Sequence, residues 1–324
     1  MTVPPSQGKV ILFGEHAVVF GRPAVGLGLP GAMVVERLRP LADHVKLCLP
    51  AWNFDGCCCH PGLLGKVLHR LFELLPGRRL GMELSVHSRI PPGAGLGSSA
   101  ALAVLLVRAL ARVRGLELDL AEQRRLAHVL EEIFHGRPSG LDDTLACFGG
   151  VCLFRRREWS KPLPALPVPA RRLSAQALGL ECRLPEMVVG YTGREHQTRH
   201  MVELVRRRRQ RQPQETEVLF AEMERCLWWG LDSLCAGRWA ELGLALNSNQ
   251  QLLELLGVSS PEIASLVQLA RRHGALGAKL TGAGGGGAVV ALAPGNQREV
   301  ARAWSRAGHR TWYLDGADDW RMAV

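Results

Sequence analysis

The sequence predicts a two-domain protein of mixed α and β structure, and three observations support that prediction. Its 324 residues are more than a single hydrophobic core usually holds. Hydrophobic residues make up 47% of the chain and charged residues 22%, as is typical of globular proteins. Strand-like and helix-like apolar patterns both occur along the chain. We place the boundary near residue 180, which gives domains of residues 1–180 and 181–324.

The predicted elements follow from apolar periodicity and from breaks at glycine and proline. Patterns typical of strands occur at 8–13, 17–19, 82–88 and within 181–190. Patterns typical of helices occur at 98–113, 119–134, 199–209, 215–235, 237–246 and 260–273. Residues 275–293 predict a strand, a glycine-rich hairpin and a second strand. The proline-rich stretch 161–170 predicts a sheet edge or a connection rather than a helix.

Charge and hydropathy restrict the partners that we expect. The net charge of +10 suits an anionic partner, but the arginine run at 206–211 has no interleaved aromatic residues and predicts a solvated helix face. No apolar run reaches the roughly 18 residues that cross a bilayer, and the N-terminal stretch lacks the features of a signal peptide. We therefore expect a cytoplasmic protein that binds no nucleic acid and no membrane.

The nine cysteines are scattered along the chain, which favours free thiols in a reducing compartment. One cluster, Cys57-Cys58-Cys59-His60, raises the alternative of a zinc site. Zinc sites usually combine two spaced cysteines with a second pair far along the chain, and no such second pair is present. We therefore interpret the cluster as a loop.

The clearest local motif is PPGAGLGSSA, Pro91 to Ala100, between a predicted strand and a predicted helix. Glycines let backbone amides approach a ligand closely, and the first amides of a helix favour phosphate. Ser98 and Ser99 at the helix start could also supply hydroxyl ligands to Mg²⁺. The motif lacks the lysine of a Walker A loop. The alternative is an ordinary turn followed by an N-terminal helix cap.

A second glycine cluster, Gly282 to Gly287 in KLTGAGGGG, contains more glycine than a hairpin needs. Two glycine-rich loops far apart in one chain favour a nucleoside triphosphate as ligand. Phosphoryl transfer also needs a cation, a carboxylate for the metal ion and a group that faces the attacking hydroxyl. Lys9, Glu131 and Asp142 are candidates of the right types.

At four places the chain resembles the mevalonate kinases, a branch of the GHMP small-molecule kinases. The matching segments are GKVILFGEHAVVFGRPAV (8–25), PPGAGLGSSAA (91–101), HGRPSGLDDTLACFGG (135–150) and KLTGAGGGG (279–287). The resemblance implies an α+β fold with an N-terminal domain like ribosomal protein S5 domain 2 and a ferredoxin-like C-terminal domain, with the active site between them. It also implies ATP-dependent phosphorylation of the primary hydroxyl of mevalonate in isoprenoid precursor synthesis.

The resemblance assigns roles to individual residues. It implies Asp142 and Lys9 as catalytic residues, Ser99 and Glu131 as ligands of Mg²⁺, and Glu15, His16 and Thr192 as mevalonate-binding residues. The residues expected to bind ATP are Pro92, Gly93, Ala94, Gly95, Leu96, Gly97, Ser98, Ser99, Gly284 and Gly285. A homodimer is also possible.

Three positions depart from the family pattern. Gln7 stands where a proline is usual before the Gly-Lys pair, Phe13 stands where a polar residue is often found, and Asp143 stands where an asparagine is common. The change at Gln7 could loosen the turn that orients Lys9.

Two alternatives to a mevalonate kinase stay open from the sequence. Another GHMP kinase, for phosphomevalonate or a sugar, would need extra cations for its substrate, and Arg22, Arg194 and Arg199 leave that open. A ligand sensor of the same fold would have no need to keep Lys9 and Asp142 together with the metal-binding residues.

Overall fold

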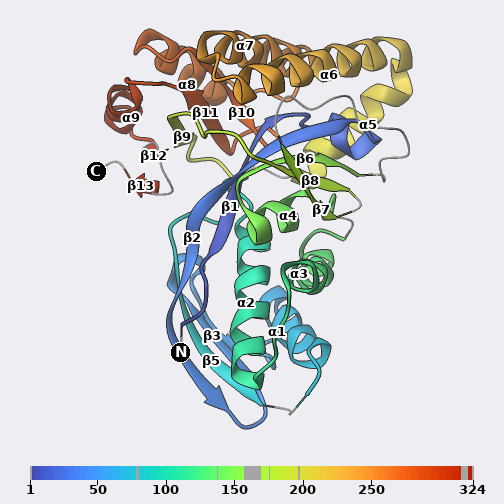
Figure 1. Ribbon diagram of the computed structural model, residues 1–324, viewed down its shortest axis with the longest axis vertical. Helices are drawn as coiled ribbons and strands as arrows, with labels where there is room; N and C mark the ends of the chain where they lie inside the picture. The colour runs from blue at the N-terminus through green and yellow to red at the C-terminus, as the bar shows by residue number, and fades with distance from the viewer. Residues whose placement is uncertain are drawn as a thin grey trace. The chain divides into compact units, whose positions relative to one another are not determined.

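The computed structural model describes residues 2–77, 80–136, 138–156, 169–174, 176–195, 198–314 and 320–322 (Figure 1). The chain forms two compact units. Unit 1 consists of Met1–Lys9, Gly28–Pro92 and Gly97–Gly149, and unit 2 of Val10–Leu27, Gly93–Leu96 and Gly150–Val324. The units alternate along the chain, and the division near residue 180 stays a prediction.

Unit 1 contains a sheet in the order β4-β3-β5-β2, in which only the β3–β5 pair among these is parallel. The first strand of the chain, β1, pairs with β2. The strands are β1 (Ser6–Phe13), β2 (Pro23–Leu41), β3 (Val45–Leu49), β4 (Phe54–Cys57) and β5 (Gly81–Ser88). β1 and β2 each contribute residues to both units.

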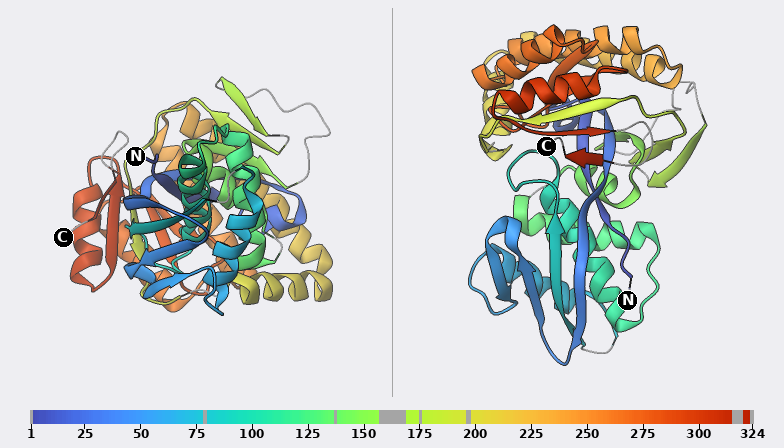
Figure 2. Two further views of the ribbon diagram at one scale, coloured as in Figure 1. Left: turned by 90° about the horizontal axis from the view of Figure 1, so that it is seen from below. Right: turned by 90° about the vertical axis from the view of Figure 1, so that its left-hand side faces the viewer.

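The helices of unit 1 cover one face of this sheet (Figures 1 and 2). They are α1 (Leu63–Leu74), α2 (Ser98–Arg114), α3 (Leu120–His135) and α4 (Leu141–Phe148), with a short 3₁₀ turn η2 at Pro50–Trp52. Asp119 caps α3 by accepting a hydrogen bond from the Glu122 amide, while the Glu122 side chain accepts one from the Asp119 amide. This reciprocal cap fixes the start of α3 where the sequence predicts it.

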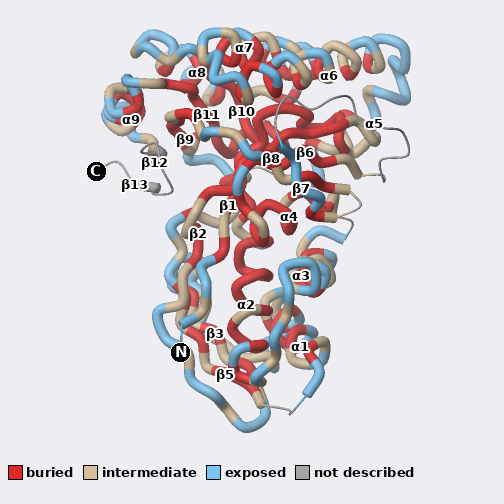
Figure 3. The backbone as a smooth tube through the Cα atoms, viewed as in Figure 1, coloured by how far each residue is buried: buried red, intermediate tan, exposed pale blue. Residues whose placement is uncertain are grey.

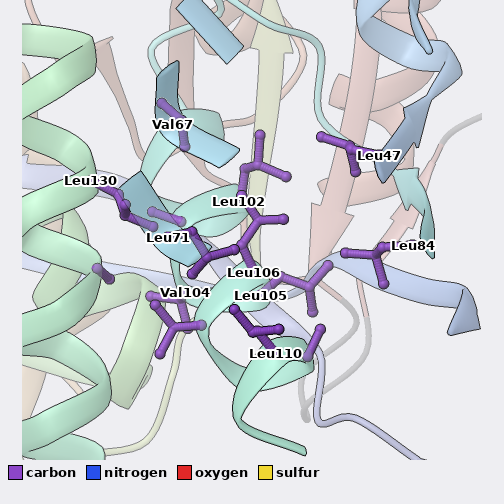
Figure 4. Packing of buried hydrophobic residues seen from close by; sticks show 14 of the residues in the cluster. Leu47, Val67, Leu71, Leu84, Leu102, Val104, Leu105, Leu106, Leu110 and Leu130 are labelled. Atoms are coloured by element: carbon purple, nitrogen blue, oxygen red, sulfur yellow. The ribbon is translucent and has the colours of Figure 1, made fainter. Parts of the chain in front are cut away.

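Helix α2 is the centre of the unit 1 core and is buried along most of its length (Figure 3). A helix that is apolar on all sides belongs inside a protein, which explains why α2 shows little amphipathic character. Figure 4 shows its leucines packed among residues of the sheet, α1 and α3. The labelled residues are Leu47, Val67, Leu71, Leu84, Leu102, Val104, Leu105, Leu106, Leu110 and Leu130.

Unit 2 contains a sheet in the order β10-β11-β9-β12-β13, and its pairs are antiparallel. Its strands are β9 (Met187–Tyr191), β10 (Gly277–Thr281), β11 (Ala288–Leu292), β12 (Arg310–Leu314) and β13 (Trp320–Met322). The unit also pairs the first residues of β2 with β6 (Val151–Arg155), which in turn pairs with β8 (Ala177–Leu180), the partner of β7 (Ala170–Ser174).

The helices of unit 2 are α5 (Thr198–Arg211), α6 (Pro213–Cys235), α7 (Trp239–Leu256), α8 (Pro261–Arg272) and α9 (Gln297–Arg306). Helices α7, α8 and α9 pack on the antiparallel sheet, and buried Trp304 of α9 donates a hydrogen bond to the Leu266 carbonyl of α8. The predicted glycine-rich hairpin is confirmed, because β10 and β11 pair directly across it.

One predicted strand is wrong. Residues 17–19 belong to a 3₁₀ turn, η1 (Ala17–Phe20), although their β-branched composition favours a strand. The proline-rich stretch 161–170 lies mostly outside the described residues. Within the described part of the chain, no helix combines the length and the apolar character needed to cross a membrane.

Candidate active site

Lys9 and Asp142 form an ion pair in unit 1. The Lys9 Nζ lies 3.3 Å from Asp142 Oδ2, and the lysine side chain is 7% exposed whereas the aspartate is 31% exposed. Asp142 lies in the first turn of α4, whose N-terminal residue is preceded by Gly140. A carboxylate there is favoured by the positive end of the helix dipole. The structure thus brings the two predicted catalytic residues together and leaves the carboxylate accessible.

The backbone around Lys9 is closely packed. Gly97, which has φ +72°, lies so close that a Cβ there would be 2.7 Å from Lys9 Cγ. Two residues earlier, the Gln7 side chain fits between Gly28 and Gly149, where an added Cβ would lie within 2.6 Å of its amide group. The glutamine that departs from the family pattern therefore occupies space that a side chain at either glycine would fill.

Asp143 faces away from this pair, as expected for a neighbour about 100° around the helix. It is fully buried and lies 3.2 Å from Arg124 and 3.3 Å from His128 on α3. The hydrogen bond with Asp143 raises the pKa of His128. The two adjacent aspartates therefore differ in role: Asp143 joins α4 to α3, and Asp142 stays beside Lys9.

Glu131, a predicted metal ligand, is completely buried on α3. Among the described residues no hydrogen bond reaches either of its carboxylate oxygens, and His135 Nε2 is 3.8 Å away. Burial raises the pKa of Glu131 to about 8, the Asp142 charge adds to the increase, and the nearby Ser99 hydroxyl opposes it. The Ser99 hydroxyl makes its hydrogen bond with His135 instead, at 3.0 Å.

A buried carboxylate without a hydrogen bond among the described residues is costly and calls for an explanation. Carboxylate and hydroxyl oxygens are the ligands that Mg²⁺ prefers, so Glu131 and Ser99 suit that ion chemically. Over the described ranges, no group of three or more His, Cys, Asp or Glu side chains is arranged to hold a metal. That search includes Cys57, Cys58 and Cys59.

The loop that precedes α2 has the conformation that only glycine adopts readily. Gly93, Gly95 and Gly97 have φ of +68°, +78° and +72°. The residue before α2 is Gly97, so no side chain caps the helix at this position. The sequence alternative of a side-chain cap is therefore not realised, and the first amides of α2, at Ser98 and Ser99, are left for an anion. ATP binding by residues 92–99 stays a prediction.

The second glycine cluster packs against protein. A Cβ on Gly284 would lie 2.0 Å from the Val258 carbonyl oxygen, and one on Gly285 would lie 2.7 Å from the Met201 sulfur. Both glycines have positive φ. These close approaches explain the glycines without a nucleotide, so ATP binding by Gly284 and Gly285 also stays a prediction.

His16 in unit 2 has an unusual environment. Its backbone has φ 60° and ψ −49°, which is rare for a residue other than glycine. Its Nε2 lies 2.9 Å from the Ala283 carbonyl oxygen, which can only accept, so Nε2 carries the proton. Burial lowers the pKa of His16 to about 4, and its buried Nδ1 has no described partner. The neutral ring therefore keeps one unused acceptor.

The other two predicted substrate residues have partners within unit 2. The Thr192 hydroxyl donates to the Gly287 carbonyl at 2.8 Å. Glu15 is 1% exposed, and its carboxylate contacts Lys279 and Asn249. The placement of Glu15 does not favour direct contact with a substrate, and that role stays a prediction. Sequence reasoning gave Lys279 no role, although a lysine inside the apolar strand AKLT could have marked it.

Comparisons with known proteins agree with these features. The family model of the GHMP kinases N terminal domain matches residues 62–150, and the GHMP kinases C terminal model matches residues 231–310. A mevalonate kinase of Pyrococcus horikoshii is 35% identical over 94% of this chain and 92% of its own length.

A second relative and a solved structure support the same family. A mevalonate kinase of Methanothermobacter thermautotrophicus is 31% identical over 93% of each protein. The crystal structure of L. major mevalonate kinase in complex with R-mevalonate superposes with a TM-score of 0.77 at 27% identity, over 99% of this chain and 95% of that chain. The expected α+β fold is thereby confirmed. The chain belongs to the mevalonate kinases of the GHMP kinase family.

Proposed function

We propose that this enzyme transfers the γ-phosphoryl group of ATP to the primary hydroxyl of mevalonate, forming phosphomevalonate and ADP. The observation that carries the proposal is the Lys9–Asp142 pair, in a chain whose relatives at 31–35% identity are mevalonate kinases. In the reaction the hydroxyl oxygen forms a bond to the γ-phosphorus, and the bond from that phosphorus to the β–γ bridging oxygen breaks. The hydroxyl proton leaves during this step.

Asp142 is the residue suited to receive that proton. Its carboxylate is partly exposed beside Lys9, whereas Asp143 is enclosed by Arg124 and His128. Lys9 suits a second task, because an ammonium group near the transferring phosphoryl stabilises the charge that develops there. Its contact with Asp142 fixes the position of both groups before substrate arrives.

We propose that Glu131 and Ser99 hold Mg²⁺. The support is the buried carboxylate of Glu131, which accepts no hydrogen bond from the described residues, so that a cation would compensate the cost of burial. When bound, Mg²⁺ neutralises charge on the β- and γ-phosphates of a nucleotide. The open amides at the start of α2 would bind phosphate oxygens.

On the substrate side, Nδ1 of His16 has no hydrogen-bond partner among the described residues. It suits a substrate hydroxyl, because an unprotonated imidazole nitrogen accepts a hydrogen bond. A phosphorylated acceptor would need free cations. Two of the candidate cations are already ion-paired: Arg22 with Glu217 and Glu224, and Arg194 with Glu262 at 2.6 Å. These pairs favour mevalonate over phosphomevalonate.

We also propose that the enzyme is cytoplasmic and that it forms the homodimer which the sequence leaves possible. Light scattering coupled to size-exclusion chromatography tests the homodimer. A mass of about twice the 35.4 kDa of one chain supports it, and the mass of a single chain contradicts it.

An ADP-release assay with Mg-ATP tests the reaction. Mevalonate, phosphomevalonate, galactose and homoserine are compared as acceptors, and we expect mevalonate to give the highest kcat/KM. A preference of more than tenfold for another acceptor would overturn the substrate and keep the kinase. No ADP release with any acceptor would favour the ligand-sensor alternative.

A further inference from the structure

Lys279 is a lysine inside a buried strand. It lies on β10, fully enclosed, and its ammonium group contacts three acceptors: the Glu15 carboxylate, the Leu280 carbonyl at 2.6 Å and the Ile11 carbonyl at 3.5 Å. An ammonium group has three protons, so every donor has an acceptor. Asn249 adds a contact of 3.4 Å to the other Glu15 oxygen.

A buried ion pair of this kind contributes little to the net free energy of unfolding. Burial raises the pKa of Glu15 and lowers that of Lys279, and the charge of each partner opposes the shift of the other. Removing two charges from water costs much of what their attraction returns, and uncharged residues of similar size often serve a core equally well. A buried pair of this kind therefore invites an explanation in terms of position.

His16, the residue after Glu15, has a backbone conformation that other contacts must hold in place. The Ala17 amide donates to the Glu15 carbonyl at 2.6 Å, across His16 with its φ of 60° and ψ of −49°. This is the rare γ-turn with a positive central φ, which is strained. Such conformations persist only where surrounding contacts impose them, at a cost of about 1–3 kcal/mol.

Contacts of the His16 ring and of the residues before it impose this turn. The carboxylate before it is held by Lys279, and its own imidazole is held by the Ala283 carbonyl. Further back, the Ile11 amide donates to Thr281 Oγ1 at 2.8 Å. All three anchors lie within residues 279–283, so β10 and the loop after it act as a template for residues 11–16.

We propose that the buried Lys279–Glu15 pair is a positioning device that holds the strained turn at His16 and so keeps Nδ1 of the imidazole available to the acceptor substrate. The inference rests on the proposed function and extends it. Neither Glu15 nor Lys279 touches substrate in this account, because both act through His16.

The test replaces the pair by uncharged side chains of similar size, Glu15→Gln with Lys279→Met, so that no single buried charge remains. We expect this double variant to fold, to raise the KM for mevalonate about tenfold, the effect of one hydrogen bond, and to leave kcat within a few-fold. The matched control is Lys46→Met with Glu83→Gln, a partly exposed pair 3.3 Å apart on the unit 1 sheet. The control should change no kinetic constant by more than twofold.

Adding His16→Ala to the double variant distinguishes a pair that acts through His16 from a pair that only stabilises the fold. If the pair acts through His16, the triple variant has the mevalonate KM of His16→Ala alone, because the two changes remove the same interaction. Effects that multiply would overturn the inference, as would an unchanged KM in a folded double variant.

Should the double variant fail to fold, Glu15→Asp shortens the carboxylate and keeps its charge, and the same comparison with His16→Ala applies. Wild-type protein that is inactive with every acceptor would overturn the proposed function and the inference together. Active wild type with an unaffected variant would overturn the inference alone.

Discussion

Each unit buries one glutamate to which the family motifs assign a role, but the two carboxylates have opposite surroundings. Glu131 in unit 1 has no hydrogen-bond partner among the described residues, and burial raises its pKa to about 8. Glu15 in unit 2 is engaged by Lys279 and Asn249. An orphaned carboxylate is a group prepared for a ligand, whereas a paired one holds the protein's own parts in place. The difference supports the proposal that Glu131 binds an ion and that Glu15 acts as a positioning residue.

Asp142→Asn should have the largest effect on catalysis. It tests the proposed chemistry of unit 1, where Asp142 lies near Glu131. Loss of a general base costs about 10²–10⁴ in rate, which is roughly 3–5 kcal/mol of transition-state stabilisation. We expect kcat to fall by at least a hundredfold at saturating mevalonate and Mg-ATP, with the thermal melt close to wild type. Because the Asp142 charge helps to raise the pKa of Glu131, that pKa should also fall. A fully active variant would remove Asp142 from the mechanism.

Glu131→Gln should weaken the use of Mg-ATP, since it removes the charge offered to the metal. The measurement is the Mg²⁺ concentration for half-maximal rate, and we expect an increase of about tenfold or more, the scale of one charge-assisted contact. Glu132→Gln is the matched control, because Glu132 is exposed one residue along the same helix. If Glu132 is the sensitive position, the assignment of the metal ligand is wrong.

Asp143→Asn should affect folding more than chemistry. It leaves Arg124 and His128 without their buried carboxylate, at a cost of about 1–3 kcal/mol. The pKa of His128 is raised in the folded protein. The stability from this contact is therefore present below the unfolded pKa of histidine and is lost as the pH rises through the folded value. Denaturant unfolding at pH 6 should show a larger loss than unfolding at pH 9, while kcat stays within a few-fold.

Local signals made much of the fold predictable. Three features depend only on nearby residues and could therefore be predicted. They are the capping residue Asp119, the apolar residues on all sides of α2 and the glycine-rich hairpin. The strand prediction at 17–19 failed because the turn at His16 depends on Lys279, whose contact with Glu15 spans 264 residues. The lysine inside the apolar strand AKLT marks Lys279 as unusual, but nothing in the residues around 17–19 reveals that it pairs with Glu15.

For the candidate site, the grouping of four residues was predictable, whereas their roles stay predictions. Family motifs place Lys9, Asp142, Ser99 and Glu131 in one unit, and the structure brings them near one another there. The motif that contains Glu15 gave no sign that its carboxylate is turned into the interior. Motif spacing identifies residue types that chemistry needs, but burial decides whether a carboxylate is offered to a ligand.

The most direct test of the difference between Glu131 and Glu15 is to replace each of them by glutamine. Folded Glu131 keeps its proton up to about pH 8, whereas an unfolded chain releases it near 4.5. Without ligand, the contribution of Glu131 to stability therefore falls as the pH rises across that window. Glu131→Gln should consequently unfold at a higher temperature than wild type at pH 8.5 and at a similar temperature at pH 5.

Glu15→Gln leaves the Lys279 ammonium without its carboxylate, which costs about 3–5 kcal/mol for a buried pair. Thermal melts of both variants at pH 8.5 without Mg-ATP should therefore shift in opposite directions, upward for Glu131→Gln and downward for Glu15→Gln. Two shifts of the same sign would contradict the account.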